Sequence, residues 1–224
     1  RVLFRSTITA TETAHPDNDL QLINDIVVKP DNIDDSKILD ERIEKIKDKT
    51  PDLEELHTDG GYGSEDNDIK MEKLGVTQIT TAIRGKQSEI ELKIEKISQE
   101  PEIYTVECPH QKRTSTPTKQ RHKVRFETQR CESCPLKDNC RIFRAKGRYY
   151  FKHGDHLKSK RNSNINTLPK ERRKLRPNVE ATMKEFKSKT NGGKVKVRGL
   201  FKTSLFAYAL GVSINIGRIY RYLI

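Results

Sequence analysis

The order of apolar patterns in the first 83 residues constrains the fold more than any other feature. Residues 5–13 alternate apolar and polar side chains, and turn-forming residues 15–19 separate them from a second apolar run over 20–28. These features predict a β-hairpin. A helix over 36–49 is expected next, with Asp34 or Asp35 at its start. Its apolar residues recur at helical spacing: Ile38, Leu39, Ile43 and Ile46.

A second strand–helix–strand series follows the first helix. Residues 53–57 form a short apolar run that leads to Asp59, and Ser64 is placed to cap a short helix that ends at Leu74. Residues 76–83 are rich in β-branched side chains and predict another strand. The predicted order is therefore β-β-α-β-α-β, which is typical of an α/β fold.

The chain changes character after residue 85, where apolar residues become sparse and basic residues become frequent. The elements expected there are strands at 104–106, 124–126 and 148–151, a polar turn at 153–156, a loop at 162–166, a helix from 171, and a last apolar-faced helix over 200–223. The uncharged stretch 203–217 is shorter than the roughly 20 residues that cross a membrane. We expect a core helix there and no membrane span.

Charge is distributed unevenly along the chain. Residues 1–100 hold 14 Lys and Arg against 23 Asp and Glu, a net charge of −9, whereas residues 101–224 hold 30 against 9, a net charge of +21. Such asymmetry indicates nucleic-acid binding, because basic side chains that neutralise phosphates release counterions. A solvated basic face is the simpler alternative. With 34% charged and 33% hydrophobic residues, we expect only a modest core.

Two carboxylates far apart in the sequence have distinctive neighbours. Asp59 follows a predicted strand and precedes Gly60-Gly61, whereas Glu180 lies early in a helix, with Arg176 and Lys187 on either side. Mg²⁺ prefers carboxylate oxygens, and two such ions can hold the attacking and leaving oxygens of a phosphodiester displacement. The alternatives are a turn-capping Asp and a first-turn Glu that the helix dipole favours.

These two segments resemble the motifs of the DDE transposases of bacterial insertion sequences. In that family a catalytic Asp lies in an Asp-x-Gly-Tyr-x-Ser context, which Asp59-Gly60-Gly61-Tyr62-Gly63-Ser64 matches. The catalytic Glu lies in a Tyr-x2-Arg-x3-Glu-x6-Lys pattern, and Arg176, Glu180 and Lys187 have this spacing, with Arg173 in place of the Tyr. Residues 11–18, 28–35 and 198–200 are similar to further landmarks of the family.

The resemblance implies a fold and a division of the chain. The fold would be an α/β, ribonuclease H-like mixed sheet flanked by helices, with a basic, Cys-containing insertion before the last helices. Residues 1–97 would form the first part of the catalytic core, residues 98–165 the insertion, and residues 166–224 the C-terminal helices that complete the core.

The resemblance also implies DNA transposition. The enzyme would hydrolyse a phosphodiester at the element's ends and join the 3′-OH to target DNA, with double-stranded DNA as partner and a homo-oligomer on paired ends. Asp59 and Glu180 would be catalytic and hold two Mg²⁺ or Mn²⁺ ions. The residues implied in phosphate binding are Arg176, Lys184, Lys187 and Arg198. The protein would act in the bacterial cytoplasm, on the nucleoid.

The family's first catalytic Asp belongs to a strand that would precede Arg1. We therefore expect this chain to be a fragment that alone binds metal poorly and does not cut DNA. An internal substitute for that Asp is the alternative, and Asp25 is a candidate because it lies in a predicted strand. The other candidates are Asp17, Asp34 and Asp35.

Four cysteines, Cys108, Cys131, Cys134 and Cys140, form a C-x22-C-x2-C-x5-C array. The C-x2-C pair can hold one side of a tetrahedral zinc site, and His110 is a substitute ligand. A structural Zn²⁺ would help to fold a segment poor in apolar residues. The alternatives are reduced thiols and disulfides. Nothing in the sequence indicates secretion, which argues against disulfides. The segment's aromatic residues would either stack on bases or form a small β core: Tyr104, Phe126, Tyr149, Tyr150 and Phe151.

Two other functions fit the same sequence. One is a non-catalytic, DNA-binding relic of a transposase, which keeps the fold and the basic half. The other is a zinc-ribbon nucleic-acid module, in residues 98–165, joined to an unrelated α/β domain.

Overall fold

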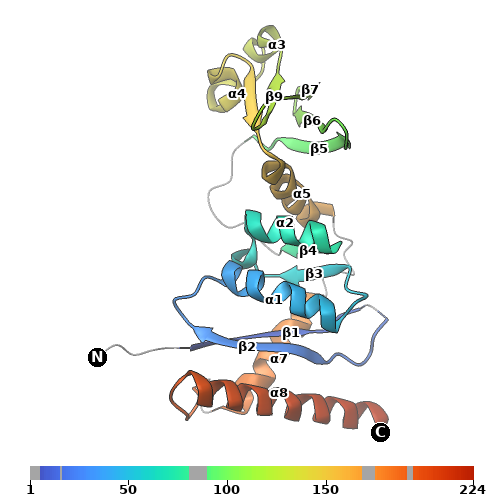
Figure 1. Cartoon of the computed structure of the whole chain (residues 1–224), viewed down its shortest axis with the longest axis vertical. Coiled ribbons are helices and arrows are strands. Elements are labelled where there is room, and N and C mark those ends of the chain that lie inside the picture. Colours follow the sequence, from blue (N-terminus) through green and yellow to red (C-terminus); the bar gives the residue numbers. More distant parts are fainter. Residues whose placement is uncertain (1–5, 16, 81–89, 168–174, 191–193) are drawn as a thin grey trace, which may run out of the picture. The chain divides into compact units, whose positions relative to one another are not determined.

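The structure is a computed structural model that describes residues 6–15, 17–80, 90–167, 175–190 and 194–224. The chain divides into two compact units, in which residues 1–53 and 168–224 form unit 1 and residues 54–167 form unit 2. The described residues form helices and four separate small sheets of the mixed α/β class, which Figure 1 labels. The predicted division at residues 97 and 165 refers to a family core and its insertion, and it stays a prediction.

Unit 1 begins with the predicted hairpin. β1 (Ser6–Glu12) pairs antiparallel with β2 (Ile23–Pro30), with an irregularity at Thr11 and Glu12. α1 (Asp35–Lys49) follows, and the Asp34 side chain accepts a hydrogen bond of 3.0 Å from the Ser36 N–H. Because this bond satisfies a backbone donor that the helix leaves unpaired, it fixes where α1 begins. The hairpin and the helix are both confirmed.

Asp25 on β2 is a buried ion-paired residue. Its side chain is 3% exposed and accepts hydrogen bonds from Arg42 Nε at 2.9 Å and Lys49 Nζ at 2.9 Å. Burial alone would raise the pKa of Asp25, but the bonds from both α1 cations outweigh it and lower this pKa. These ion pairs hold β2 against α1. Because the Asp25 carboxylate is buried and already paired with two cations, it is poorly suited to replace a catalytic Asp.

Two C-terminal helices complete unit 1, namely α7 (Leu175–Ser188) and α8 (Leu200–Leu223). Their shared apolar core consists of Ile23, Phe186, Leu210 and Ile214. The Asn215 side chain accepts a hydrogen bond from the Ile23 N–H at 2.9 Å and donates one to the Ile23 carbonyl at 2.8 Å. This pair of bonds ties α8 to the start of β2.

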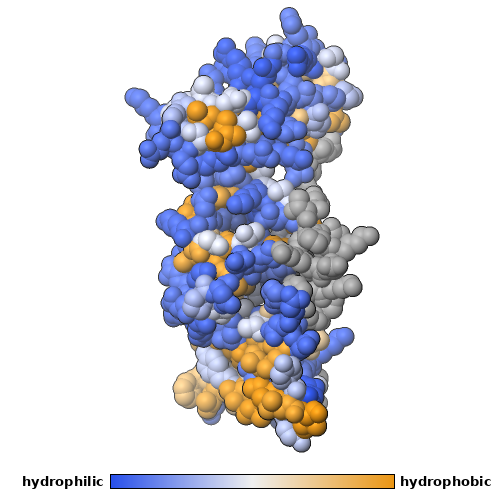
Figure 2. All heavy atoms as spheres, turned by 90° about the vertical axis from the view of Figure 1, so that its right-hand side faces the viewer, coloured by the Kyte–Doolittle hydropathy of each residue, from blue (hydrophilic) through white to orange (hydrophobic). Residues whose placement is uncertain are grey.

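α8 has one buried and one exposed apolar face. The exposed face includes large side chains at helical spacing, and Figure 2 shows this hydrophobic surface in orange. Its most exposed members are Phe201, Leu205, Val212, Ile216, Tyr220 and Leu223. By length and composition alone α8 could cross a membrane. Its opposite face packs against the hairpin and carries the hydrogen bonds of Asn215. Only 22% of its apolar window is buried, so the expected core helix is buried on one side alone.

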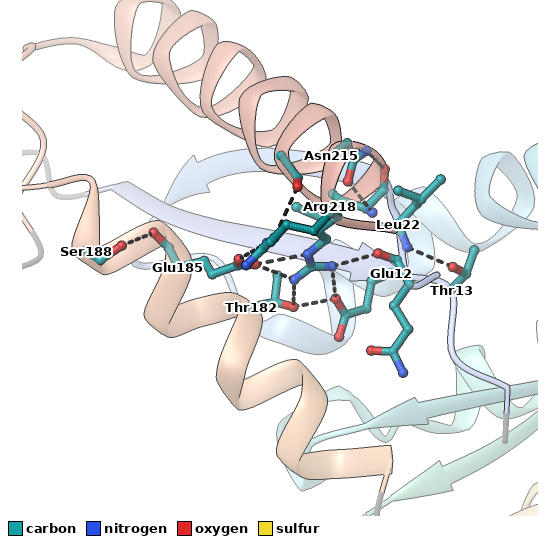
Figure 3. Close-up of polar contacts among 12 residues, drawn as sticks. Glu12, Thr13, Leu22, Thr182, Glu185, Ser188, Asn215 and Arg218 are labelled. Atoms are coloured by element: carbon teal, nitrogen blue, oxygen red, sulfur yellow. Dashed lines mark hydrogen bonds and ion pairs between the residues drawn. The ribbon is translucent and has the colours of Figure 1, made fainter. Parts of the chain in front are cut away.

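A polar network centred on Arg218 connects three elements of unit 1 (Figure 3). The Arg218 guanidinium on α8 donates to Glu12 Oε2 on β1 at 3.0 Å and to Glu185 Oε2 on α7 at 2.6 Å. It also donates to the Thr182 hydroxyl at 2.6 Å and the Gln21 carbonyl at 3.0 Å. Since Glu12 is nearly fully buried, this network supplies the cation that its carboxylate needs.

We predict that Arg218→Met destabilises the protein by about 3 kcal/mol, because it leaves the buried Glu12 carboxylate without its cation. Arg221→Met is the matched control, since Arg221 pairs with Glu185 from a side chain that is 66% exposed. That change should cost at most about 1 kcal/mol. Urea unfolding of both variants measures the difference, and equal losses would contradict a special role for Arg218.

Unit 2 begins with the parallel pair β3 (Glu55–Thr58) and β4 (Thr77–Thr80). The 3₁₀ turn η1 (Gly60–Tyr62) and helix α2 (Glu65–Leu74) connect them. This strand–helix–strand order confirms the prediction. Only the first part of the strand expected over 76–83 can be compared, since residues 81–83 lie outside the described residues.

The segment after residue 90 forms two three-stranded antiparallel sheets. The first contains β5 (Lys93–Ser98), β6 (Ile103–Cys108) and β7 (Gln111–Thr114), and the second contains β8 (Thr116–Pro117), β9 (His122–Arg125) and β10 (Arg148–Phe151). Three short helices lie between β9 and β10: α3 (Thr128–Glu132), η2 (Lys137–Asn139) and α4 (Arg141–Arg144). The three strands expected here are confirmed, whereas β5, β7 and β8 were not predicted.

The aromatic residues of this segment were expected either to stack on bases or to form a small β core. Tyr104, Phe126 and Phe151 are each at most 3% exposed, and they belong to the apolar core between the two sheets. Tyr104 and Phe151 pack edge to face, with ring centroids 5.4 Å apart. The aromatics therefore form the small β core, and only Tyr150 among them is largely exposed.

The expectations for residues 153–166 were wrong. Both the polar turn at 153–156 and the loop at 162–166 belong to one helix, α5 (His153–Thr167). Polar side chains make several of its contacts to the rest of unit 2. Ser159 Oγ donates to the Leu92 carbonyl at 3.1 Å, and Asn164 Nδ2 donates to the Gln78 carbonyl at 3.2 Å. Because polar side chains make these contacts, α5 has no apolar periodicity that a sequence analysis could detect.

Candidate functional site

Asp59 lies where the sequence predicted it, directly after β3. It is the N-cap of η1, and its Oδ1 accepts a hydrogen bond from the Gly60 N–H at 2.5 Å. The residue is exposed, whereas Gly60 is buried. Ser64 then caps α2 by accepting from the Asn67 N–H at 3.1 Å. Ligand sites of α/β sheets are commonly found at the carboxyl ends of strands, which is the position of Asp59.

Arg161 of α5 supports the turn that follows Asp59. Its Nη1 lies 3.2 Å from Asp68 Oδ1 and donates to the Ser64 carbonyl at 3.4 Å. A β-carbon on Gly63 would lie only 2.5 Å from the same nitrogen. A side chain at position 63 would therefore require the Arg161 guanidinium to move. Sequence analysis missed Arg161, because nothing in residues 153–167 indicated a helix.

Asp68 on α2 is a buried carboxylate near this turn, in contrast to the exposed Asp59. Burial raises its pKa to about 6, although the charge of Arg161 lowers it in part. Its Oδ2 atom has no hydrogen-bond partner among the described residues. The group therefore depends on Arg161 for its charged form, and sequence analysis did not single it out.

We predict that Gly63→Ala destabilises the protein by about 2 kcal/mol, because the new methyl group displaces Arg161 from its buried partner. Gly217→Ala is the control, since nothing lies within 4 Å of a β-carbon there. Gly217 is inside α8, where Ala should stabilise by roughly 0.5–1 kcal/mol. Thermal unfolding measures both, and two shifts of the same sign would contradict the role of Gly63.

Glu180 lies on the exposed face of α7. Lys184 and Lys187 follow at helical spacing and are exposed as well, whereas Thr182 and Phe186 are buried. The Thr182 hydroxyl donates to Glu12 Oε2, which fixes the rotation of α7 within unit 1. The carboxylate and two of the predicted phosphate-binding cations therefore share one side of the helix.

The other two predicted phosphate-binding residues, Arg176 and Arg198, lie before Glu180 and after Lys187 in the sequence. Arg176 falls on the first turn of α7, four residues before Glu180. Arg198 is exposed in the segment before α8. The next residue, Gly199, is the N-cap of α8 and has a positive φ of 88°. Both stay predictions as ligands.

Asp59 and Glu180 belong to different units, so each unit alone supplies one of the two carboxylates. Within the described part of the chain, no three His, Cys, Asp or Glu side chains form a group that could hold a metal ion. The oxygen donors of Asp59 and Glu180 nevertheless suit Mg²⁺ in type.

The four cysteines line one small cavity of unit 2, together with His110. Cys108 ends β6, Cys131 lies in α3, and Cys140 precedes α4. Burial raises the pKa of the Cys131 thiol, with a smaller contribution from the other three thiols, while a 3.4 Å hydrogen bond from Gln111 Nε2 opposes this. All four are free cysteines, and disulfides between them are absent.

The comparisons with known proteins bear on this arrangement. The sequence model of the transposase DDE domain family matches residues 101–220, more than half of the chain. The match contains Glu180, Arg176, Lys187 and the cysteines, whereas Asp59 lies outside it. Neither a curated protein nor a solved structure matches the chain. Its sequence places the chain in the transposase DDE domain family.

Proposed function

We propose that the protein takes part in DNA transposition as a metal-dependent phosphodiester hydrolase and strand transferase that acts at insertion-sequence ends. One observation carries the proposal, namely that Glu180 shares the exposed face of α7 with Lys184 and Lys187. A carboxylate beside cations suits a phosphate-bearing substrate whose metal the carboxylate would hold. The family match includes this helix.

The order of elements supports a ribonuclease H-like core. An antiparallel hairpin, a helix, and a parallel strand–helix–strand unit follow one another from β1 to β4. Asp59 stands at the carboxyl end of β3, as the resemblance implies for a catalytic Asp.

In this proposal Asp59 and Glu180 hold Mg²⁺ or Mn²⁺ through their carboxylate oxygens. The bound metal would supply charge stabilisation for the attacking and leaving oxygens. Arg176, Lys184, Lys187 and Arg198 would bind the phosphates of duplex DNA from element ends or target. A homo-oligomer on paired ends and a cytoplasmic, nucleoid-bound location are further parts of the proposal.

The test uses the full-length protein and a plasmid that carries the DNA flanking its gene. Glu180→Gln and Asp59→Asn should each lower Mg²⁺-dependent strand cleavage at least about a hundredfold and retain DNA binding. The matched controls are Glu44→Gln on α1 and Asp66→Asn on α2, both at exposed positions. We expect these controls to keep the activity of the parent protein.

Activity in Glu180→Gln equal to that of the controls would contradict the proposed catalytic role. A parent protein that binds DNA but never cleaves it would instead support the alternative function, a non-catalytic relic. The family match spans both the Cys-containing segment and α7–α8, which favours one family domain over a zinc-ribbon module joined to an unrelated one.

We further propose a structural zinc ion at Cys108, Cys131, Cys134 and Cys140. Support comes from the common cavity that the four side chains line, and from the C-x2-C pair at the end of α3. Thiolate sulfur is a preferred zinc donor, although the side chains must turn toward one another to form the tetrahedral group.

Metal analysis of purified protein should find about one zinc per chain, and Cys134→Ser should lose it together with thermal stability. Ser133→Ala is the matched control, since it alters the neighbouring residue without removing a sulfur. A zinc-free parent protein with four titratable thiols would contradict the zinc site and favour reduced cysteines.

A further inference from the structure

An open groove in unit 2 is lined by four basic side chains. They are Arg113, Arg125, Lys146 and Arg148, with Phe126 and Glu127 among the other lining residues. The groove is formed by β7, β9, the start of α3 and the start of β10. None of these cations belongs to the residues already proposed to bind phosphate.

The acidic side chain in the groove is already engaged. Glu127 forms ion pairs with Arg113 and with Arg130, the latter at 2.8 Å. Both pairs lower the pKa of Glu127, with the Arg113 hydrogen bond as the main cause. Among the described residues, no carboxylate forms an ion pair with Arg125, Lys146 or Arg148. The groove therefore presents an excess of positive charge.

Two of the cations are placed where they oppose each other. Arg125 on β9 and Arg148 on β10 are direct cross-strand partners and are both exposed. Like charges in this position destabilise a sheet. Their neighbours on the inner face, Val124 and Tyr149, pack against the core, so the strands hold both guanidinium groups on the outer face. An anion between these groups would remove the repulsion.

The backbone at Lys146 adds an independent observation. Lys146 has a φ of 52°, the positive-φ exception among the described non-glycine residues. A Schellman motif at the end of a helix requires this left-handed conformation, and Lys is an unusual residue at that position. Hydrogen bonds from the Lys146 N–H to Phe143 O and from the Gly147 N–H to Ile142 O, both 2.9 Å, hold the bend. The bend places Lys146 on the groove.

We propose that this groove binds the sugar-phosphate backbone of duplex DNA. One guanidinium group can donate two parallel hydrogen bonds to the oxygens of one phosphate. Three cations of the groove have no carboxylate partner, and each would neutralise phosphate charge: Arg125, Lys146 and Arg148. Polar and charged side chains make up most of the lining of the groove, which favours contact with the charged backbone over contact with a base. The inference rests on the proposed function for its choice of DNA, and it assigns a contact surface separate from the catalytic carboxylates.

The test measures binding of the full chain to a labelled DNA duplex of mixed sequence across a salt series. Arg125→Gln/Arg148→Gln should weaken binding about tenfold or more and reduce the slope of log K against log salt by about 2. Lys146→Asn should also weaken binding without loss of stability, because Asn tolerates a positive φ. Removal of the opposed charges should leave the melting temperature of the double variant unchanged or higher.

Lys73→Gln/Lys93→Gln is the control, since it removes the same charge from exposed positions of α2 and β5. An equal loss in this control, or parent-like binding by Arg125→Gln/Arg148→Gln, would overturn the groove assignment. Preference for an RNA duplex over DNA would overturn the choice of ligand. None of these results bears on cleavage by Glu180, and an active Glu180→Gln would contradict the proposed chemistry without affecting the groove.

Discussion

The arrangement of unit 1 depends on the hydrogen bonds that the Arg218 guanidinium donates. It joins Glu12 on β1 to Glu185 on α7 from a position on α8, so that two helices and the hairpin share one polar centre. Thr182 adds a bond to the same Glu12 carboxylate. Because Thr182 and Glu185 point toward this centre, the opposite side of α7, with Glu180, is left on the surface. The network thus sets which helix face can meet a substrate.

The elements that bury apolar residues could be predicted from the sequence. The hairpin, α1 and α8 all have apolar residues at the period of their structure, and Asp34 and Ser64 cap helices where expected. The turn after β3 was also predictable, because an Asp followed by two glycines favours a tight turn over a longer strand. These features are local, and local chemistry determines them.

The elements that depend on polar contacts between distant segments could not be predicted. α5 is fixed by Ser159, Arg161 and Asn164, which bond to strands and turns at least 65 residues away in sequence. Buried charges such as Asp68 look like surface residues in the sequence, since only the fold shows their burial. The basic groove has the same origin, because β-sheet register brings Arg125 beside Arg148. In both cases tertiary pairing, not composition, creates the feature.

The central proposal is that Asp59 and Glu180 hold the same metal ions, and the structure describes these two residues in separate units. The most direct test replaces Mg²⁺ by Fe²⁺ in the full-length protein bound to DNA and maps where metal-generated radicals cut the polypeptide. The account predicts cuts close to residue 59 and close to residue 180, both lost when either carboxylate is replaced by its amide. Cuts at one of the two segments alone, or cuts that persist in both variants, would contradict it.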